Sequence, residues 1–232
     1  EGAAIGLAIG NFVGTGNVPL VYLQNSGLGN AINPIVSLGI PEIMATPIVL
    51  LVGWRGEMFG NGQQIKDEPQ HFLQGRITLP LLETMQIPKL VVNKCVDFIP
   101  SLNKMKNKAL ARQGPTALVV RKETFTDLLA KSTVPSLINI RNSERILSRE
   151  DALKIVVSGI GLNSPIVSTT GMLSRELYEL REKSNHNSDL LVVGGMGHAI
   201  SISAGLAIAQ PHRKIFCLDG DGAVLMHMGA LA

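Results

Sequence analysis

The sequence contains few aromatic residues, few cysteines and little net charge. Phe, Trp and Tyr make up 4% of its 232 residues, and the formal charge is only +3. A surface that stacks nucleic-acid bases therefore has little support, and we expect no nucleic-acid partner. Cys95 and Cys217 are far apart in the sequence. Such cysteine usage favours a reducing, cytoplasmic location over a disulfide framework.

Charge is missing altogether from one long segment, because no Asp, Glu, Lys or Arg occurs from Gly2 to Pro41. Glycine, asparagine and proline residues interrupt the apolar runs of this segment, so we expect no membrane span. An uncharged segment in a soluble chain is expected to be buried on every side. An interface between subunits would bury it, since obligate interfaces resemble a domain core cut in half.

Two common phosphate-binding motifs, GxxxxGK[ST] and GxGxxG, are also absent. The sequence instead places an apolar run, Lys214–Leu218, directly before Asp219-Gly220-Asp221-Gly222. A carboxylate after a parallel strand can bind a hard cation, and glycine N–H groups at a helix start can bind an anion. The motif lacks the ligands of an EF-hand loop. It therefore predicts either a metal-bridged phosphate site or a plain turn.

Apolar runs alternate with helical patterns along the chain, which predicts α/β structure with two parallel sheets covered on both faces. The expected strands are Val18–Gln24, Pro47–Val52, Lys89–Val92, Thr116–Val120, Pro165–Thr169, Leu190–Val193 and Lys214–Leu218. The expected helices are Gly75–Met85, Val96–Arg112, Arg149–Val157, Ser174–Lys183 and His198–Ala209.

The polar stretch between these two series of elements predicts a division into residues 1–123, a linker 124–147, and residues 148–232. Ser148 has the features of a helix N-cap, with acidic residues in the first turn. The chain begins without methionine, inside a helical pattern. We therefore expect an internal piece of a longer protein, with the first domain shortened at its N-terminus and the second at its C-terminus.

Several motifs together resemble the thiamine diphosphate-dependent 2-oxoacid decarboxylases, and among them most closely the phosphonopyruvate decarboxylases. They are EGAA at 1–4, YLQNSGLGNAINP at 22–34, GWRGE at 53–57, DEPQH at 67–71, STTGMLSRELYELR at 168–181, GGMGHA at 194–199 and GDGA at 220–223. The resemblance implies a pyrimidine-binding domain followed by a diphosphate-binding domain. It also implies active sites shared between the chains of a homo-oligomer.

The resemblance implies decarboxylation of 3-phosphonopyruvate to phosphonoacetaldehyde and carbon dioxide, in phosphonate biosynthesis, with thiamine diphosphate and Mg²⁺. Sulfopyruvate or another small 2-oxoacid is the alternative substrate, and a non-catalytic cofactor-binding fragment is the alternative of another class. By the same resemblance, Glu1 would be a catalytic residue that binds the pyrimidine ring and activates the cofactor, and Asp221 would bind the metal ion. The other expected cofactor-binding residues are Gly194, Met196, Gly220, Gly222 and Ala223.

A 2-oxoacid that also carries a phosphonate needs basic partners. Arg55, which follows a predicted strand, and His198 are the expected substrate-binding residues, whereas Lys66 and Arg76 are more simply explained as solvated charges. Asp67, Glu68 and His71 form an acid–base cluster suited to protonating the reaction intermediate after carbon dioxide leaves, and Asp67 and His71 are the expected catalytic residues. The polar stretch 59–66 is a candidate lid. The segment 24–27 offers short polar groups to a site or forms a turn that caps the following helix, two interpretations that fit equally well. The segment 168–171 is similar, and its hydroxyls and glycine could bind an anion.

Overall fold

The computed structural model describes residues 1–94, 96–126, 147–182 and 188–232. The chain divides into two compact units, residues 1–131 and 132–232. Most of the expected linker, 124–147, lies outside the described residues, so its boundaries stay a prediction. Cys95 also lies outside them.

The first unit is built on a parallel four-stranded sheet with the order β1-β2-β4-β3. Its strands are β1 (Leu20–Gln24), β2 (Val49–Gly53), β3 (Lys89–Val92) and β4 (Thr116–Val120). Its helices are α1 (Gly2–Thr15), α2 (Leu28–Pro34), α3 (Phe72–Thr84) and α4 (Phe98–Arg112). The short turns η1 (Asn25–Gly27), η2 (Ile35–Gly39) and η3 (Pro69–His71) connect them.

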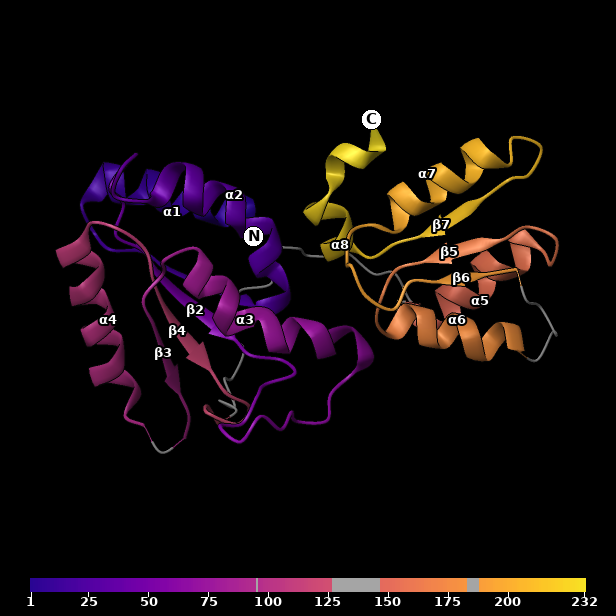
Figure 1. Ribbon diagram of the computed structural model, residues 1–232. Coiled ribbons are helices and arrows are strands. Elements are labelled where there is room, and N and C mark those ends of the chain that lie inside the picture. Colours follow the sequence, from indigo (N-terminus) through magenta and orange to yellow (C-terminus); the bar gives the residue numbers. More distant parts are fainter. Residues whose placement is uncertain (95, 127–146, 183–187) are drawn as a thin grey trace. The chain divides into compact units, whose positions relative to one another are not determined.

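Helices cover both faces of this sheet (Figure 1). On one face, Leu50 and Val52 of β2 belong to a core with Ile5 of α1 and Leu82 of α3. On the other face, Val49 of β2 packs in a core that includes residues of α4. Neighbouring residues of β2 therefore point into opposite cores, which is why the strand reads as a continuous apolar run.

The second unit contains a smaller parallel sheet with the order β6-β5-β7. Its strands are β5 (Ile166–Ser168), β6 (Leu190–Leu191) and β7 (Phe216–Leu218). Its helices are α5 (Arg149–Ile160), α6 (Met172–Glu182), α7 (Ala199–Ala209) and α8 (Asp221–Met226), followed by η4 (Met228–Leu231). Helices α5 and α6 lie on one face of the sheet and α7 on the other (Figure 1). The prediction of two parallel-sheet units is confirmed.

Most element boundaries agree with the sequence-based expectation. Ser148 caps α5, because its hydroxyl accepts a hydrogen bond from the N–H of Asp151 at 3.1 Å. Strand β6 is shorter than expected and α3 begins at Phe72 rather than Gly75. Among the described ranges, no helix is long and apolar enough to cross a membrane.

Candidate functional site

The parallel register of the first sheet brings the carboxyl ends of three strands to one edge. Gln24 of β1 aligns with Gly53 of β2, and Gly53 aligns with Val120 of β4. A cavity of about 540 Å³ opens at this edge. It is lined by Leu23, Gln24, Gly53, Trp54, Arg55, Glu57, Ile65, Lys66, Asp67, Val120, Arg121 and Lys122. Ligands of open α/β sheets bind at such strand ends.

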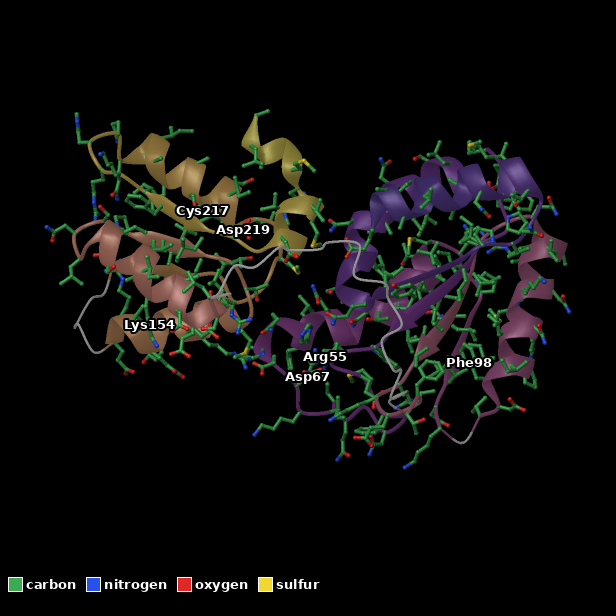
Figure 2. The ribbon with its side chains drawn as sticks, turned by 180° about the vertical axis from the view of Figure 1, so that it is seen from behind. Arg55, Asp67, Phe98, Lys154, Cys217 and Asp219 are labelled. Atoms are coloured by element: carbon green, nitrogen blue, oxygen red, sulfur yellow. The ribbon has the colours of Figure 1, made fainter. Side chains whose placement is uncertain are left out.

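Arg55 and Asp67, which the sequence suggested as separate site residues, form an ion pair in this cavity (Figure 2). Arg55 Nε donates to Asp67 Oδ2 at 2.8 Å, and Nη2 donates to Oδ1 at 2.5 Å. The guanidinium, with the backbone N–H groups of Glu68 and Gly56, holds the pKa of Asp67 well below its usual range. Asp67 is therefore ionised near neutral pH, where it can orient Arg55 but has no proton to donate.

His71 lies at the end of η3 and is 8% exposed. Burial, followed by the nearby charge of Arg55, lowers the pKa of its imidazole. Its Nδ1 is buried without a hydrogen-bond partner. His71 stays a candidate for the proton transfer that the sequence predicted.

Two glycines allow the loop that carries His71 to approach the strand end closely. A Cβ on Gly56 would lie 2.2 Å from the carbonyl oxygen of His71, and a Cβ on Gly75 would lie 1.8 Å from the carbonyl oxygen of Gly56. Gly56 also has a φ of +63°, in the left-handed region. A side chain at either position would push Arg55 and His71 apart.

Asn25 is a site residue whose role the sequence left open. Its Nδ2 donates to the carbonyl oxygen of Arg55 and to Thr78 Oγ1, both at 2.9 Å, and its Oδ1 accepts from the N–H of Arg55 at 3.1 Å. The side chain is 5% exposed. Asn25 therefore fixes the backbone of Arg55 and is not free to contact a ligand. Its place directly after a strand indicated a role but not which one.

Glu1 lies against the same turn, η1, from the side of α1. A Cβ on Gly27 would lie 2.4 Å from Glu1 Cγ, so a side chain there would force the Glu1 side chain to shift. Asn30 Nδ2 donates to Glu1 Oε2 at 3.1 Å. Since η1 also carries Asn25, one three-residue turn positions both Glu1 and Arg55.

The second unit gathers its glycine motifs in the same way, at the carboxyl ends of β6 and β7. Gly195 and Gly197, in the turn after β6, have φ values of +59° and +91°. A Cβ on Gly222, after β7, would lie 3.1 Å from Met196 Cε. The structure therefore brings Met196 and Gly222 together, although the sequence places them 26 residues apart.

Other predicted residues of the second unit lie beside this contact. Ala223 is buried, and the N–H of Gly220 donates to Asp219 Oδ1 at 2.9 Å. Gly194 is half-buried in the turn after β6. The ring of His198 lies 4.4 Å from that of His227, centroid to centroid, and its Nδ1 is 2.8 Å from the carbonyl oxygen of Gly195.

At the strand ends of the second unit, two side-chain oxygen atoms are available to bind a ligand or a metal ion. Asp219 Oδ2, at the end of β7 (Figure 2), and Thr169 Oγ1, at the end of β5, are both buried without a hydrogen-bond partner. Asp221 is exposed at the first position of α8. Within the described ranges, no three His, Cys, Asp or Glu side chains form a metal site. A magnesium ion takes one or two carboxylates and completes its shell with phosphate oxygens and water, so these residues fit it.

Two further basic candidates differ in their surroundings. Arg76 lies over the ring of Phe72 at 4.1 Å and donates to Gln64 Oε1 at 3.3 Å. Lys66 lines the cavity of the first unit. Gln64 Nε2 donates to the carbonyl oxygens of Gly56 and Phe72, so the candidate lid 59–66 is tied down near its end.

Residues 167–232, which contain the turns after β5, β6 and β7, match the family described as thiamine pyrophosphate enzyme, C-terminal TPP binding domain. The whole chain is 34% identical to a phosphonopyruvate decarboxylase of Streptomyces viridochromogenes and 33% identical to one of Streptomyces hygroscopicus. The resemblance to thiamine diphosphate-dependent decarboxylases is thereby confirmed. The chain spans 58% and 57% of the length of these two relatives.

The chain is also similar to proteins named sulfopyruvate decarboxylase. It is 37% identical to the sulfopyruvate decarboxylase subunit beta of Methanothermobacter thermautotrophicus, over 37% of the chain and 44% of that protein. Among solved structures, benzoylformate decarboxylase from Polynucleobacter necessarius matches with a TM-score of 0.32 and 18% identity, over 55% of this chain and 24% of that one.

Proposed function

We propose that this chain is part of an enzyme that decarboxylates 3-phosphonopyruvate to phosphonoacetaldehyde and carbon dioxide, with thiamine diphosphate and Mg²⁺. The observation that carries the proposal is the similarity over the full chain to two proteins named phosphonopyruvate decarboxylase, at 34% and 33% identity. A sulfopyruvate decarboxylase of Methanosarcina acetivorans, also matched over the full chain, is 24% identical.

The cofactor would be held by residues of both units. Glu1, supported by Gly27 and Asn30, would bind the pyrimidine ring. Gly194, Met196, Gly220, Gly222 and Ala223 would form the walls of the diphosphate site, with Asp221 on the magnesium ion. Asp219 is a second candidate ligand, because its Oδ2 has no partner. Bound thiamine diphosphate supplies an electron sink for decarboxylation.

The protein side chains of the first unit would orient the substrate and deliver the proton. Arg55 is fixed in position by Asp67 and by Asn25. His71 would deliver a proton to the carbon that loses carbon dioxide. His198 of the second unit is the further candidate for contact with the substrate.

A second copy of the chain is the partner that the first unit favours. Within the described residues, the edge strand β1 pairs with β2 alone, and Tyr22 on it is 82% exposed. Leu7 of α1 is 77% exposed, and both residues belong to the uncharged segment 2–41. Large apolar side chains that remain exposed on one uncharged surface are typical of a subunit interface. We propose a homo-oligomer with active sites between its chains.

Carbon dioxide release from the full-length protein tests this function. The protein would be assayed with thiamine diphosphate and Mg²⁺ on phosphonopyruvate, sulfopyruvate and pyruvate. We expect the highest kcat/KM for phosphonopyruvate. A higher kcat/KM for sulfopyruvate would indicate sulfopyruvate as the substrate in place of phosphonopyruvate, in line with the 37% identity to the beta subunit named above. Cofactor binding without any carbon dioxide release would indicate a non-catalytic protein.

A further inference from the structure

The cavity of the first unit is lined by more positive than negative side chains. Its charged lining consists of Arg55, Glu57, Lys66, Asp67, Arg121 and Lys122. Four of these side chains are basic and two are acidic, in a space of about 540 Å³. Their pairing determines which charges remain available to a ligand.

The two arginines are already engaged within the protein. Arg55 is bound by Asp67 through two hydrogen bonds. Arg121 Nη1 lies 3.8 Å from Glu57 Oε2, and its Nη2 donates to the carbonyl oxygen of Met58 at 2.9 Å. The guanidinium of Arg121 also lies 5.3 Å from the centroid of the Trp54 ring. Both arginines are therefore fixed in the lining of the cavity by interactions within the protein. The carboxylates of Asp67 and Glu57 are engaged in these interactions.

The ammonium groups of the two lysines in the cavity are available to bind a ligand. Lys66 makes no ion pair or side-chain hydrogen bond with the residues that the structure describes. Among the described side chains, the ammonium of Lys122 pairs with Glu123 alone, at 4.0 Å, and the two side chains are 68% and 74% exposed. An exposed pair at that distance contributes little. The surplus positive charge of the cavity is therefore carried by two flexible ammonium groups.

From this arrangement we infer that Lys66 and Lys122 bind the distal anionic group of the substrate, a tetrahedral phosphonate or sulfonate. This inference rests on the proposed function for the identity of the substrate. Each ammonium group offers three donors that can rotate toward the oxygen atoms of such a group. Arg55, whose position is fixed, would then face the 2-oxoacid end. The two lysines would determine specificity without taking part in the chemistry.

The test compares Lys66→Gln, Lys122→Gln and the double variant with Lys106→Gln as control, all in the full-length protein. Lys106 is exposed on α4, away from the cavity lining. For phosphonopyruvate, we expect each cavity variant to raise KM about tenfold or more, the scale of a charged hydrogen bond. The value of kcat should stay within about twofold, Lys→Arg should restore much of the affinity, and the control should match the wild type.

Pyruvate, which has no distal anion, separates this role from a general loss of structure. Its kcat/KM should be unchanged in Lys66→Gln and Lys122→Gln. Equal losses on pyruvate and phosphonopyruvate would overturn the inference, because the lysines would then bind the shared carboxylate or support the fold. An unchanged KM for phosphonopyruvate would overturn it as well.

A binding measurement tests the anion site independently of decarboxylation. Isothermal titration of the wild-type protein with 3-phosphonopropanoate should give binding that the double variant loses and Lys106→Gln retains. Propanoate should bind the wild type and the double variant equally weakly. If no substrate is decarboxylated but this pattern is found, the proposed function fails and the anion site stands. If substrates are turned over but the double variant binds 3-phosphonopropanoate as well as the wild type, only the site inference fails.

Discussion

At the residue scale, the candidate site depends on positions where a side chain would not fit. Gly75 is the tightest of these, since a Cβ there would lie 1.8 Å from the carbonyl oxygen of Gly56. The carbonyl oxygen of Gly75 also accepts a hydrogen bond from Trp54 Nε1 at 2.8 Å. The start of α3 is therefore packed closely against the segment that follows β2 and contains Arg55.

Replacement of Gly75 by alanine should lower the free energy of unfolding of the first unit by about 1–3 kcal/mol, the range seen for overpacking. Trp54 is the single tryptophan of the chain, so its fluorescence during urea unfolding reports on this unit. Gly60→Ala is the matched control, because a Cβ there has nothing within 4 Å. A Gly75→Ala protein as stable as the control would show that the close approach of Gly75 to the carbonyl oxygen of Gly56 does not affect the free energy of unfolding.

The Arg55–Asp67 pair should make stability depend on acidity. The pKa of Asp67 is held below its ordinary value in the folded state. Its contribution is therefore complete above the ordinary carboxyl pKa of about 3.9 and is lost as the pH falls below that value.

Asp67→Asn removes this contribution, so the stability of the variant should fall less steeply than that of the wild type between about pH 5 and pH 2. Urea titrations followed by Trp54 fluorescence at several pH values would measure the two slopes. Glu83→Gln is a suitable control, since Glu83 is 73% exposed in its pair with Lys89. Parallel slopes for wild type and Asp67→Asn would contradict the lowered pKa.

At the scale of elements, continuous apolar runs allowed an accurate prediction. β3 and β4 occupy the expected residues, because each is a short run rich in apolar residues that begins directly after a proline. The Gly, Asn and Pro residues of the region 28–39 have low helix propensity, yet α2 and η2 form there against the core through Leu28 and Ile35. Tertiary packing outweighed local propensity.

The candidate site was predictable in part for the same reason. Strand ends could be located from the sequence, so Arg55 and the motif at Asp221 could be assigned to them. The partners of these residues could not, because the pairing of Arg55 with Asp67, or of Asn25 with Arg55, depends on how a loop returns to the sheet. Asp219 was likewise visible in its motif, but its unpartnered oxygen appears only in three dimensions.

The strand end of β7 leads to a prediction about the metal. In the full-length protein, Asp221→Ala should abolish magnesium-dependent binding of thiamine diphosphate. The Mg²⁺ ion would lose a carboxylate ligand, and the charge of the diphosphate would then remain uncompensated. Asp219→Asn should weaken it, because Oδ2 of Asp219 is available for a ligand. Titration of the cofactor with and without Mg²⁺, followed calorimetrically, measures both effects.

The control for this experiment is Asp151→Asn, at the exposed start of α5. It should bind the cofactor as the wild type does. Magnesium-dependent affinity that survives Asp221→Ala would remove Asp221 from the metal site and leave Asp219 as the candidate.

At the scale of the whole molecule, the two halves of the proposed site belong to separate compact units. Glu1 lies in the first unit and Asp221 in the second. The uncharged segment 2–41 exposes large apolar side chains such as Leu7 and Tyr22. If a second copy covers this surface, each active site can take its Glu1 from one chain and its Asp221 from the other.

Subunit exchange tests this sharing directly. Glu1→Gln and Asp221→Ala full-length proteins should each be inactive alone, Glu1→Gln because it slows proton transfer at the cofactor by about two orders of magnitude or more. A random equal mixture should regain activity, because about one quarter of the sites would combine an intact Glu1 with an intact Asp221 from different chains. A mixture of Glu1→Gln with the Glu1→Gln/Asp221→Ala double variant is the control, and it should regain none. If exchange is proven by mass labelling and the first mixture stays as inactive as its components, each site takes both residues from one chain.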